Sequence, residues 1–208
     1  MTFQFDNDLR TSVAANLSAF EAELLDDDQL RRAAVAIVIV ADAASASILL
    51  TLRPASINRH SGQYALPGGR LDEGETVIEA ALRELHEELN IALTQSDVLG
   101  RLDDYPTRSG FRISPVVMWG NDVTDIQPDP SEVAQVFHLP LDQLNSPDIP
   151  ALSPPDGEGR QVLSMWMPVL GHAMYAPTAA MLYQFREVAL NGRPTRVAHF
   201  DQPQFAWK

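Results

Sequence analysis

A chain of 208 residues, of which 45% are hydrophobic, is long and apolar enough to bury one substantial core. It has no cysteine, which excludes disulfides, thiolate metal sites and cysteine nucleophiles, and Lys208 is its only lysine, which excludes Schiff-base and P-loop lysines. The formal net charge of −13 predicts a surface that repels polyanions, so we expect no long nucleic acid as a partner.

The N-terminal part of the chain predicts a helix and then two strands. Residues 9–30 carry leucine and phenylalanine at an amphipathic spacing, which favours a helix. The β-branched run at residues 33–41 predicts a buried strand and is too short to span a membrane, and residues 48–52 predict a second strand. The first residues lack the basic and apolar regions of a secretory signal, so we expect a cytoplasmic protein with no membrane partner.

A glycine-containing loop and a capped helix follow. Pro67-Gly68-Gly69 lets the backbone approach a ligand closely. Thr76 and Glu79 form a capping box, which predicts a helix from about residue 77 to residue 89. Asn90 stands just past that helix, where a left-handed residue is usual. Apolar residues at helical spacing predict the face that packs on the core: Ile78, Leu82, Leu85 and Leu89.

Carboxylates gather beside this apolar face. Glu84 and Glu88 are four residues apart and therefore lie one above the other, with Glu87 one turn from Glu84. Arg83 is four residues from both Glu79 and Glu87 and can pair with each. Clustered carboxylates repel one another unless a cation lies among them, and hard oxygen ligands suit Mg²⁺ or Mn²⁺. The alternative is a solvated helix face with ordinary ion pairs; the preceding glycines favour the metal site.

The second half of the chain predicts a mixture of strands and helices. We expect strands at residues 98–105, 110–119, 133–139 and 162–169, and helices at residues 141–145 and 177–191. Residues 146–160 hold four prolines and predict a loop. The pattern indicates an α/β or α+β sandwich. We expect a single domain over residues 1–208, with its core at about 31–190, the N-terminal helix before it and a short C-terminal tail.

The loop and helix also match a longer pattern of fixed spacings. The residues in register are Gly69, Glu75, Arg83, Glu84, Leu85, Glu87, Glu88 and Ile91. Asn90 replaces the final glycine of the pattern. This stretch resembles the Nudix box, the signature of enzymes that hydrolyse a nucleoside diphosphate linked to another group. The resemblance implies the Nudix-type α/β/α sandwich around a mixed β-sheet.

Residues upstream of the box resemble the coenzyme A pyrophosphatase branch of that family. The matching residues are Leu49, Leu50, Thr51, Arg53, Gly62, Pro67, Gly68 and Gly69. Pro54, Asn58 and Leu66 depart from the branch pattern, and Arg59 follows the position of the missing arginine. Segments at 110–117, 130–141 and 177–182 also resemble this branch. The resemblance implies cleavage of coenzyme A or acyl-coenzyme A to 3′,5′-ADP and (acyl-)4′-phosphopantetheine.

The resemblance also implies roles for individual residues. The metal ligands for Mg²⁺ or Mn²⁺ would be the Gly68 carbonyl, Glu84, Glu87 and Glu88. Arg83, partnered by Glu75, would orient the carboxylates, and the catalytic set would be Glu84, Arg83, Glu87 and Glu132. Glu132 stands where such enzymes carry an outlying carboxylate that binds metal or acts as a base. The substrate-binding residues would be Arg53, Arg59, Arg70 and Gly69.

Two alternatives stay open. One is a Nudix hydrolase for ADP-ribose, NADH or a nucleoside triphosphate. The other is a Nudix-fold module that senses a nucleotide without cutting it, although the complete set of carboxylates favours an enzyme. In each case we expect a small nucleoside diphosphate compound as the partner, and a homodimer stays open.

Overall fold

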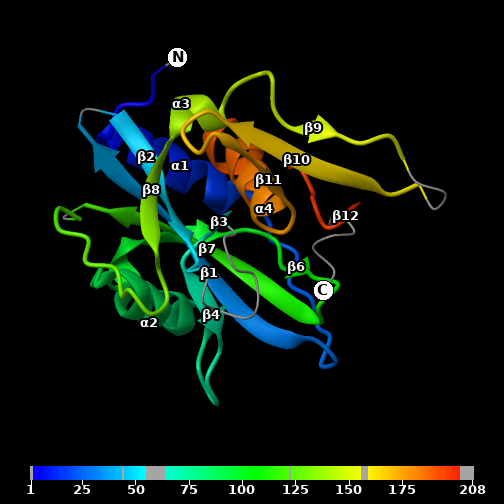
Figure 1. Ribbon diagram of the computed structural model, residues 1–208, viewed down its shortest axis with the longest axis horizontal. Helices are drawn as coiled ribbons and strands as arrows, with labels where there is room; N and C mark the ends of the chain where they lie inside the picture. The colour runs from blue at the N-terminus through cyan, green and yellow to red at the C-terminus, as the bar shows by residue number, and fades with distance from the viewer. Residues whose placement is uncertain (1, 44, 55–63, 122, 156–158, 202–208) are drawn as a thin grey trace.

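The computed structural model describes residues 2–43, 45–54, 64–121, 123–155 and 159–201. A mixed β-sheet forms its centre, with helices on both faces (Figure 1). The strands of this sheet are β1 (Arg31–Asp42), β2 (Ser45–Leu52), β3 (Tyr64–Ala65), β4 (Gly68–Arg70), β5 (Val98–Arg101), β6 (Tyr105–Pro106), β7 (Phe111–Gly120) and β8 (Gln135–Pro140). A smaller sheet contains β9 (Ala151–Leu152), β10 (Gln161–Met167), β11 (His172–Tyr175) and β12 (Phe200–Asp201).

The helices are short and connect these strands. They are α1 (Asn7–Ala19), α2 (Val77–Leu89), η1 (Gln95–Asp97), α3 (Leu141–Leu144), α4 (Thr178–Phe185) and the π-helical turn η2 (Arg186–Leu190). Within the described residues, no helix is long and apolar enough to cross a membrane.

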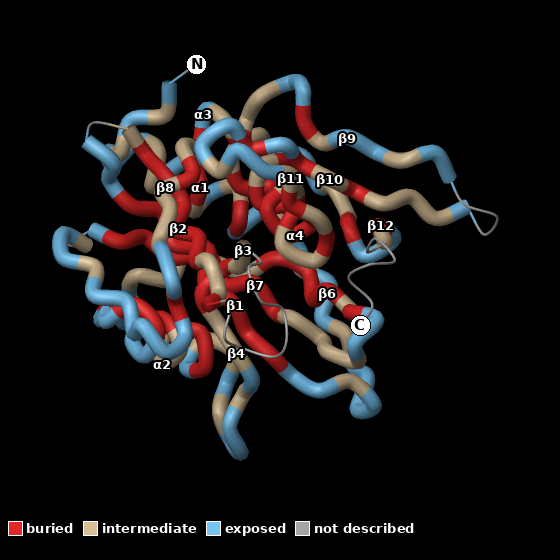
Figure 2. The backbone as a smooth tube through the Cα atoms, in the orientation of Figure 1, coloured by how far each residue is buried: buried red, intermediate tan, exposed pale blue. Residues whose placement is uncertain are grey.

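Strand β1 is the centre of the main sheet. It pairs antiparallel with β2 and β4 and parallel with β7. Its residues from Ala33 to Val40 are all buried, whichever way they point, so the strand shows no alternation of apolar and polar residues. Such a continuous apolar run is expected where helices cover both faces of a sheet. Figure 2 shows the buried residues concentrated along β1, β2 and β7.

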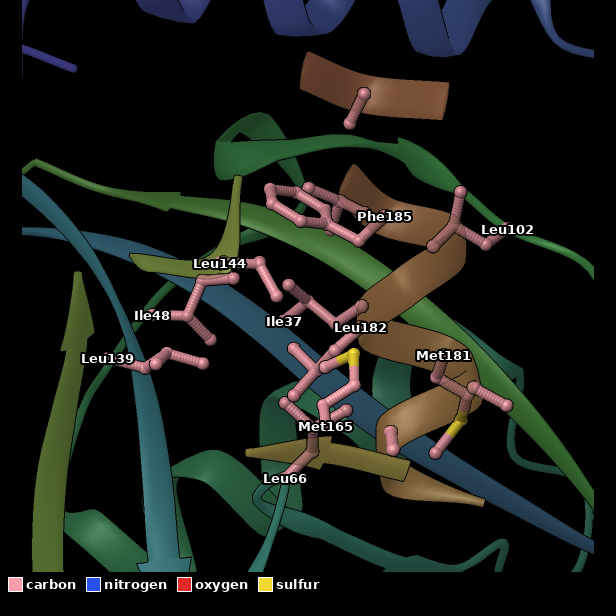
Figure 3. Packing of buried hydrophobic residues seen from close by; sticks show 14 of the residues in the cluster. Ile37, Ile48, Leu66, Leu102, Leu139, Leu144, Met165, Met181, Leu182 and Phe185 are labelled. Atoms are coloured by element: carbon pink, nitrogen blue, oxygen red, sulfur yellow. The ribbon is translucent and has the colours of Figure 1, made fainter. Parts of the chain in front are cut away.

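Alternate residues of β1 contribute to two separate apolar clusters. Val35, Ile37 and Ile39 pack in the cluster that includes residues of α1 and α4. Figure 3 shows Ile37 of β1 near Leu182 of α4 in this cluster. The intervening residues, such as Ala36 and Val38, pack against the buried face of α2. The structure therefore confirms the predicted sandwich of helices around a mixed sheet.

The predicted helix at residues 9–30 is wrong in its second half. Helix α1 ends at Ala19, and the chain then runs on without helical structure. The backbone N–H of Glu23 donates to Asp103 Oδ1 at 2.8 Å, and that of Leu25 donates to Asp104 Oδ2 at 3.0 Å. These long-range hydrogen bonds compete with helical ones, and the local apolar spacing does not reveal them.

Most other elements agree with the sequence prediction. The predicted helix at residues 77–89 coincides with α2, and the one at 177–191 corresponds to α4 and η2 together. The predicted strand at residues 98–105 divides into β5 and β6. The sequence does not predict β9 or β11. Strand β9 lies within residues 146–160, where we expected a loop, and pairs antiparallel with β10. Strand β11 pairs antiparallel with β10 through a turn at Gly171.

Candidate functional site

Local interactions define the two ends of α2, the helix that carries the box carboxylates. Thr76 Oγ1 accepts a hydrogen bond from the Glu79 N–H at 3.2 Å, and Glu79 Oε2 accepts one from the Thr76 N–H at 2.8 Å. Asn90 ends the helix in the left-handed conformation, with φ 57° and ψ 31°. Both predictions are confirmed. Glu79 is therefore engaged in capping the helix, and its predicted pair with Arg83 is not among the ion pairs of the described residues.

Arg83 lies at the centre of a hydrogen-bonded network. Its Nε and Nη2 donate to the two carboxylate oxygens of Glu75, at 2.9 and 3.0 Å. Its Nη1 donates to Glu84 Oε1 at 2.9 Å and to Glu87 Oε2 at 2.8 Å. Nη2 also donates to the Arg70 carbonyl at 2.9 Å, which ties β4 to α2. The predicted contacts of Arg83 with Glu75 and Glu87 are thus present, and Arg83 also holds Glu84.

The two glycines of the loop each leave room for a specific neighbour. Gly68 has a φ of 151°, and a Cβ placed on it would lie 2.2 Å from the Ala34 carbonyl oxygen in the adjacent strand. A Cβ on Gly69 would lie 2.3 Å from Glu84 Oε1. Gly68 therefore allows β4 to pair closely with β1, whereas Gly69 gives space to a box carboxylate.

Glu88 is a buried carboxylate with an unsatisfied oxygen. Glu88 is 3% exposed, and its Oε2 has no hydrogen-bond partner among the described residues. Burial raises the pKa of Glu88 to about 8; the positive charge of Arg53 opposes this shift, and the negative charges of Glu84 and Glu132 add to it. Burial also raises the pKa of Glu84, against the hydrogen bond from Arg83.

Glu132 lies in the turn between β7 and β8. The Asp129 N–H donates to the Glu88 carbonyl at 2.9 Å, and the Glu132 N–H donates to the Asp129 carbonyl at 3.0 Å. The turn is therefore attached to the C-terminal end of α2. Glu132 is exposed there, and its charge raises the pKa of both Glu84 and Glu88. The structure thus brings the predicted outlying carboxylate near the box carboxylates.

The donor set fits a divalent cation. Among the described residues, no group of three or more His, Asp or Glu side chains is already arranged to hold a metal ion, and Arg83 holds one oxygen each of Glu84 and Glu87. The orphan oxygen of Glu88 nevertheless lacks the partner that a buried charged group requires. Carboxylate oxygens are the ligands that Mg²⁺ and Mn²⁺ prefer. The metal-binding roles of Gly68, Glu84, Glu87 and Glu88 stay a prediction.

Gly68 and Arg53, which both affect the pKa of Glu88, also line a cavity of about 210 Å³, although none of the box carboxylates lies in its wall. Arg53, which attracts the charge of Glu88, lies in its wall beside Gly68. The apolar part of the wall comes from distant segments and includes Tyr64, Leu66, Phe111, Ile113 and Met181. Of the predicted substrate-binding residues, Arg59 lies outside the described residues, as do Asn58 and Gly62.

Several residues of the cavity wall could not be identified from the sequence. Tyr64, Phe111 and Met181 come from β3, β7 and α4, and no spacing pattern connects them. The only available signal was that the segments at 110–117 and 177–182 resemble the coenzyme A branch. The resemblance indicates that these segments take part in the site, but it assigns no role to the individual side chains.

Comparison with known proteins decides the family. The model of the NUDIX domain matches residues 30–169, which is more than half of the chain. The chain belongs to the NUDIX family. The match covers β1, the glycine loop, α2 and the Glu132 turn, so the whole carboxylate cluster lies inside the NUDIX domain.

Curated relatives of this NUDIX chain carry the same family name. The uncharacterized Nudix hydrolase NudL of Pectobacterium atrosepticum is 40% identical over 116 residues, which are 55% of this chain and 60% of that protein. Nudix hydrolase 3 of Caenorhabditis elegans is 32% identical over 149 residues, 67% of this chain and 62% of that protein. The chain thus spans about three fifths of the length of the relatives it matches.

Solved structures are similar to a smaller degree. The MutT protein from Methanosarcina mazei Go1 has 20% sequence identity and a TM-score of 0.45, covering 61% of this chain and 83% of that protein. An Ap4A hydrolase of C. elegans in a binary complex has 22% identity and a TM-score of 0.43, covering 54% of this chain and 82% of that protein. The NUDIX assignment depends on the family model and the box residues, and not on these structures.

Proposed function

We propose that this NUDIX protein is a hydrolase that adds water across the diphosphate of a nucleoside diphosphate derivative and requires Mg²⁺ or Mn²⁺. The observation that carries the proposal is the buried, unpartnered oxygen of Glu88 next to Glu84 and the Glu132 turn. A bound divalent ion neutralises phosphate charge and lowers the pKa of coordinated water. Glu84, Glu87 and Glu88, with the Gly68 carbonyl, are the groups that would hold it.

The other residues of the cluster have positioning and proton-transfer roles in this proposal. Arg83, fixed by both oxygens of Glu75, keeps Glu84 and Glu87 directed to one side of α2. Arg53 lies in the cavity wall, where a guanidinium can hydrogen-bond a substrate phosphate. Glu132 is exposed and near the carboxylates, so it is the group we assign to accept a proton from the attacking water.

We further propose coenzyme A or an acyl derivative as the substrate, with 3′,5′-ADP and 4′-phosphopantetheine as products. The support is the match of residues 49–53 and 67–69 to the coenzyme A pattern, together with the position of Arg53 beside Gly68 in the cavity. An apolar wall with few polar groups suits the organic part of a nucleotide derivative.

A substrate panel tests both parts of the proposal. Coenzyme A, dephospho-coenzyme A, ADP-ribose, NADH and a nucleoside triphosphate are each incubated with Mg²⁺ and with Mn²⁺, and products are identified by mass. We expect the highest kcat/KM with coenzyme A and no turnover in EDTA. If ADP-ribose or NADH is cleaved at least tenfold more efficiently, the coenzyme A assignment is wrong. If no compound is cleaved and a nucleotide only binds, the protein is a sensor.

A further inference from the structure

Two arginines share one aromatic ring at the start of β7. The guanidinium carbon of Arg31 lies 4.0 Å from the centroid of the Phe111 ring, and that of Arg70 lies 5.3 Å from it. Arg31 is paired with Phe111 in the parallel β1–β7 register, and Arg70 is paired with Ala33 in the antiparallel β1–β4 register. Paired residues point to the same face of a sheet, so strand register brings all three side chains together.

The face that carries these arginines is the one that bears the cavity. Strand register places four residues of the cavity wall on the same face of the sheet as Arg31. They are Val35 of β1, Gly68 of β4, and Phe111 and Ile113 of β7. The box helix α2 covers the opposite face, where Gly69 meets Glu84. Phe111 thus connects the cavity, which contains Arg53, to the two further guanidinium groups.

Local hydrogen bonds hold this edge of the cavity in place. The Phe111 N–H donates to Thr107 Oγ1 at 2.9 Å, and the Thr107 N–H donates to the Phe111 carbonyl at 2.7 Å. Arg31 Nη2 donates to the Ser109 carbonyl at 2.7 Å, inside the same turn. The ring and the Arg31 guanidinium are therefore positioned before a ligand binds, which lowers the entropy lost on binding.

Within the part of the chain that the structure describes, the two guanidinium groups have no anionic partner. Among the described residues, neither Arg31 nor Arg70 forms an ion pair with a carboxylate, although the chain has a formal net charge of −13. Two like charges beside one ring repel each other, whereas each of them is attracted to the ring face. A phosphate between them would accept charge-assisted hydrogen bonds from both planar groups.

We propose that Arg31 and Arg70 bind a phosphomonoester carried by the nucleoside part of the substrate, separate from the diphosphate that is cleaved. The inference rests on the proposed function, because it requires the diphosphate near Arg53 and Glu88 and the nucleoside in the cavity next to Phe111. In this proposal, Arg31 and Arg70 favour substrates that carry a third phosphate over substrates that carry two. The two arginines would select the substrate without contacting the phosphorus atoms that react.

Hydrolysis kinetics of a matched substrate pair provide the first test. Coenzyme A and dephospho-coenzyme A differ only in the phosphomonoester on the ribose. In wild type we expect kcat/KM to be at least tenfold higher for coenzyme A. Arg31→Ala and Arg70→Ala should each lower that ratio by roughly tenfold, through KM, as expected for loss of a charge-assisted hydrogen bond. Arg70→Ala keeps the backbone carbonyl to which Arg83 donates, so the network of Arg83 is preserved.

Arg10→Ala is the matched control. Like Arg31 and Arg70, Arg10 of α1 forms no ion pair among the described residues, but it lines neither the cavity nor the surface hollow that contains Arg31 and Arg70, and it should keep the wild-type ratio. An Arg10→Ala variant that loses as much discrimination as Arg31→Ala would show a general effect of charge and overturn the proposal. So would a wild-type protein that cleaves both substrates equally well.

A binding measurement separates this inference from the proposed function. Calorimetric titration of the metal-free protein with 3′,5′-ADP and with 5′-AMP requires no hydrolysis. Tighter binding of 3′,5′-ADP by at least tenfold, lost in Arg31→Ala and Arg70→Ala and kept in Arg10→Ala, supports the phosphomonoester site even if coenzyme A is not cleaved. Equal affinity of the wild type for the two nucleotides would overturn it even if coenzyme A is cleaved.

Discussion

Replacing Glu88 with glutamine should stabilise the metal-free protein, and the gain should increase with pH. Glutamine has nearly the shape of a protonated glutamate but cannot ionise. Glu88 is 3% exposed and has an unsatisfied oxygen, and burial raises its pKa from an ordinary 4.5 to about 8. The folded chain therefore retains a proton at pH values where the unfolded chain has already lost it.

The size of the effect follows from this pKa difference. Because the folded pKa is the higher one, ionisation of Glu88 destabilises the fold progressively from pH 4.5 upward and levels off above about pH 8. Each pH unit in that window is worth about 1.36 kcal/mol. The difference in unfolding free energy between Glu88→Gln and wild type should thus be about 1 kcal/mol at pH 5, roughly 3 kcal/mol at pH 7 and roughly 5 kcal/mol at pH 9.

Urea denaturation in EDTA measures this difference at each pH. Trp119 is 2% exposed and stacks on Phe5, so its fluorescence reports loss of the core. Glu73→Gln, at an exposed loop position, is the control and should show no pH-dependent gain. A Glu88→Gln variant that is no more stable than wild type at pH 9, or whose gain is the same at pH 5 and pH 9, would refute the reasoning.

Three further predictions concern the same loop and helix. Glu84→Gln should lower kcat by on the order of 100-fold or more with Mg²⁺ or Mn²⁺, while the melting temperature in EDTA stays level or rises; full activity would contradict the assigned role. Gly69→Ala should displace the Glu84 carboxylate, because its Cβ would lie 2.3 Å from Oε1, and should lower kcat at least tenfold with little change in melting temperature. Gly68→Ala, whose Cβ would meet the backbone of Ala34, should instead lower the melting temperature, and equal melting curves for the two variants would show that the glycines do not differ in this way. At the left-handed Asn90, valine should destabilise the fold by about 1 kcal/mol or more and glycine should be neutral or slightly stabilising, as measured by thermal unfolding; equal melting temperatures would refute the assignment of strain.

The sequence by itself determined what depends on neighbours within one or two helical turns. The capping box, the left-handed Asn90 and the bounds of α2 follow from local hydrogen bonds and backbone preferences, and each agrees with the structure. The spacing of Glu84, Glu87 and Glu88 likewise follows from the helical repeat. The same local reasoning failed for α1 after Ala19, since backbone N–H groups of that segment donate hydrogen bonds to the distant Asp103 and Asp104.

Tertiary structure decided everything that depends on strand register and on long-range docking. The parallel pairing of β1 with β7 places Arg31 beside Phe111, and the pairing of β1 with β4 adds Arg70. Attachment of the Asp129 turn to the end of α2 brings Glu132 near Glu88. Burial, and with it the raised pKa of Glu88, depends on how completely the sheet and loop cover that helix face. The physical reason is that side-chain spacing encodes local geometry, whereas the packing of separate elements is the result of interactions among all of them.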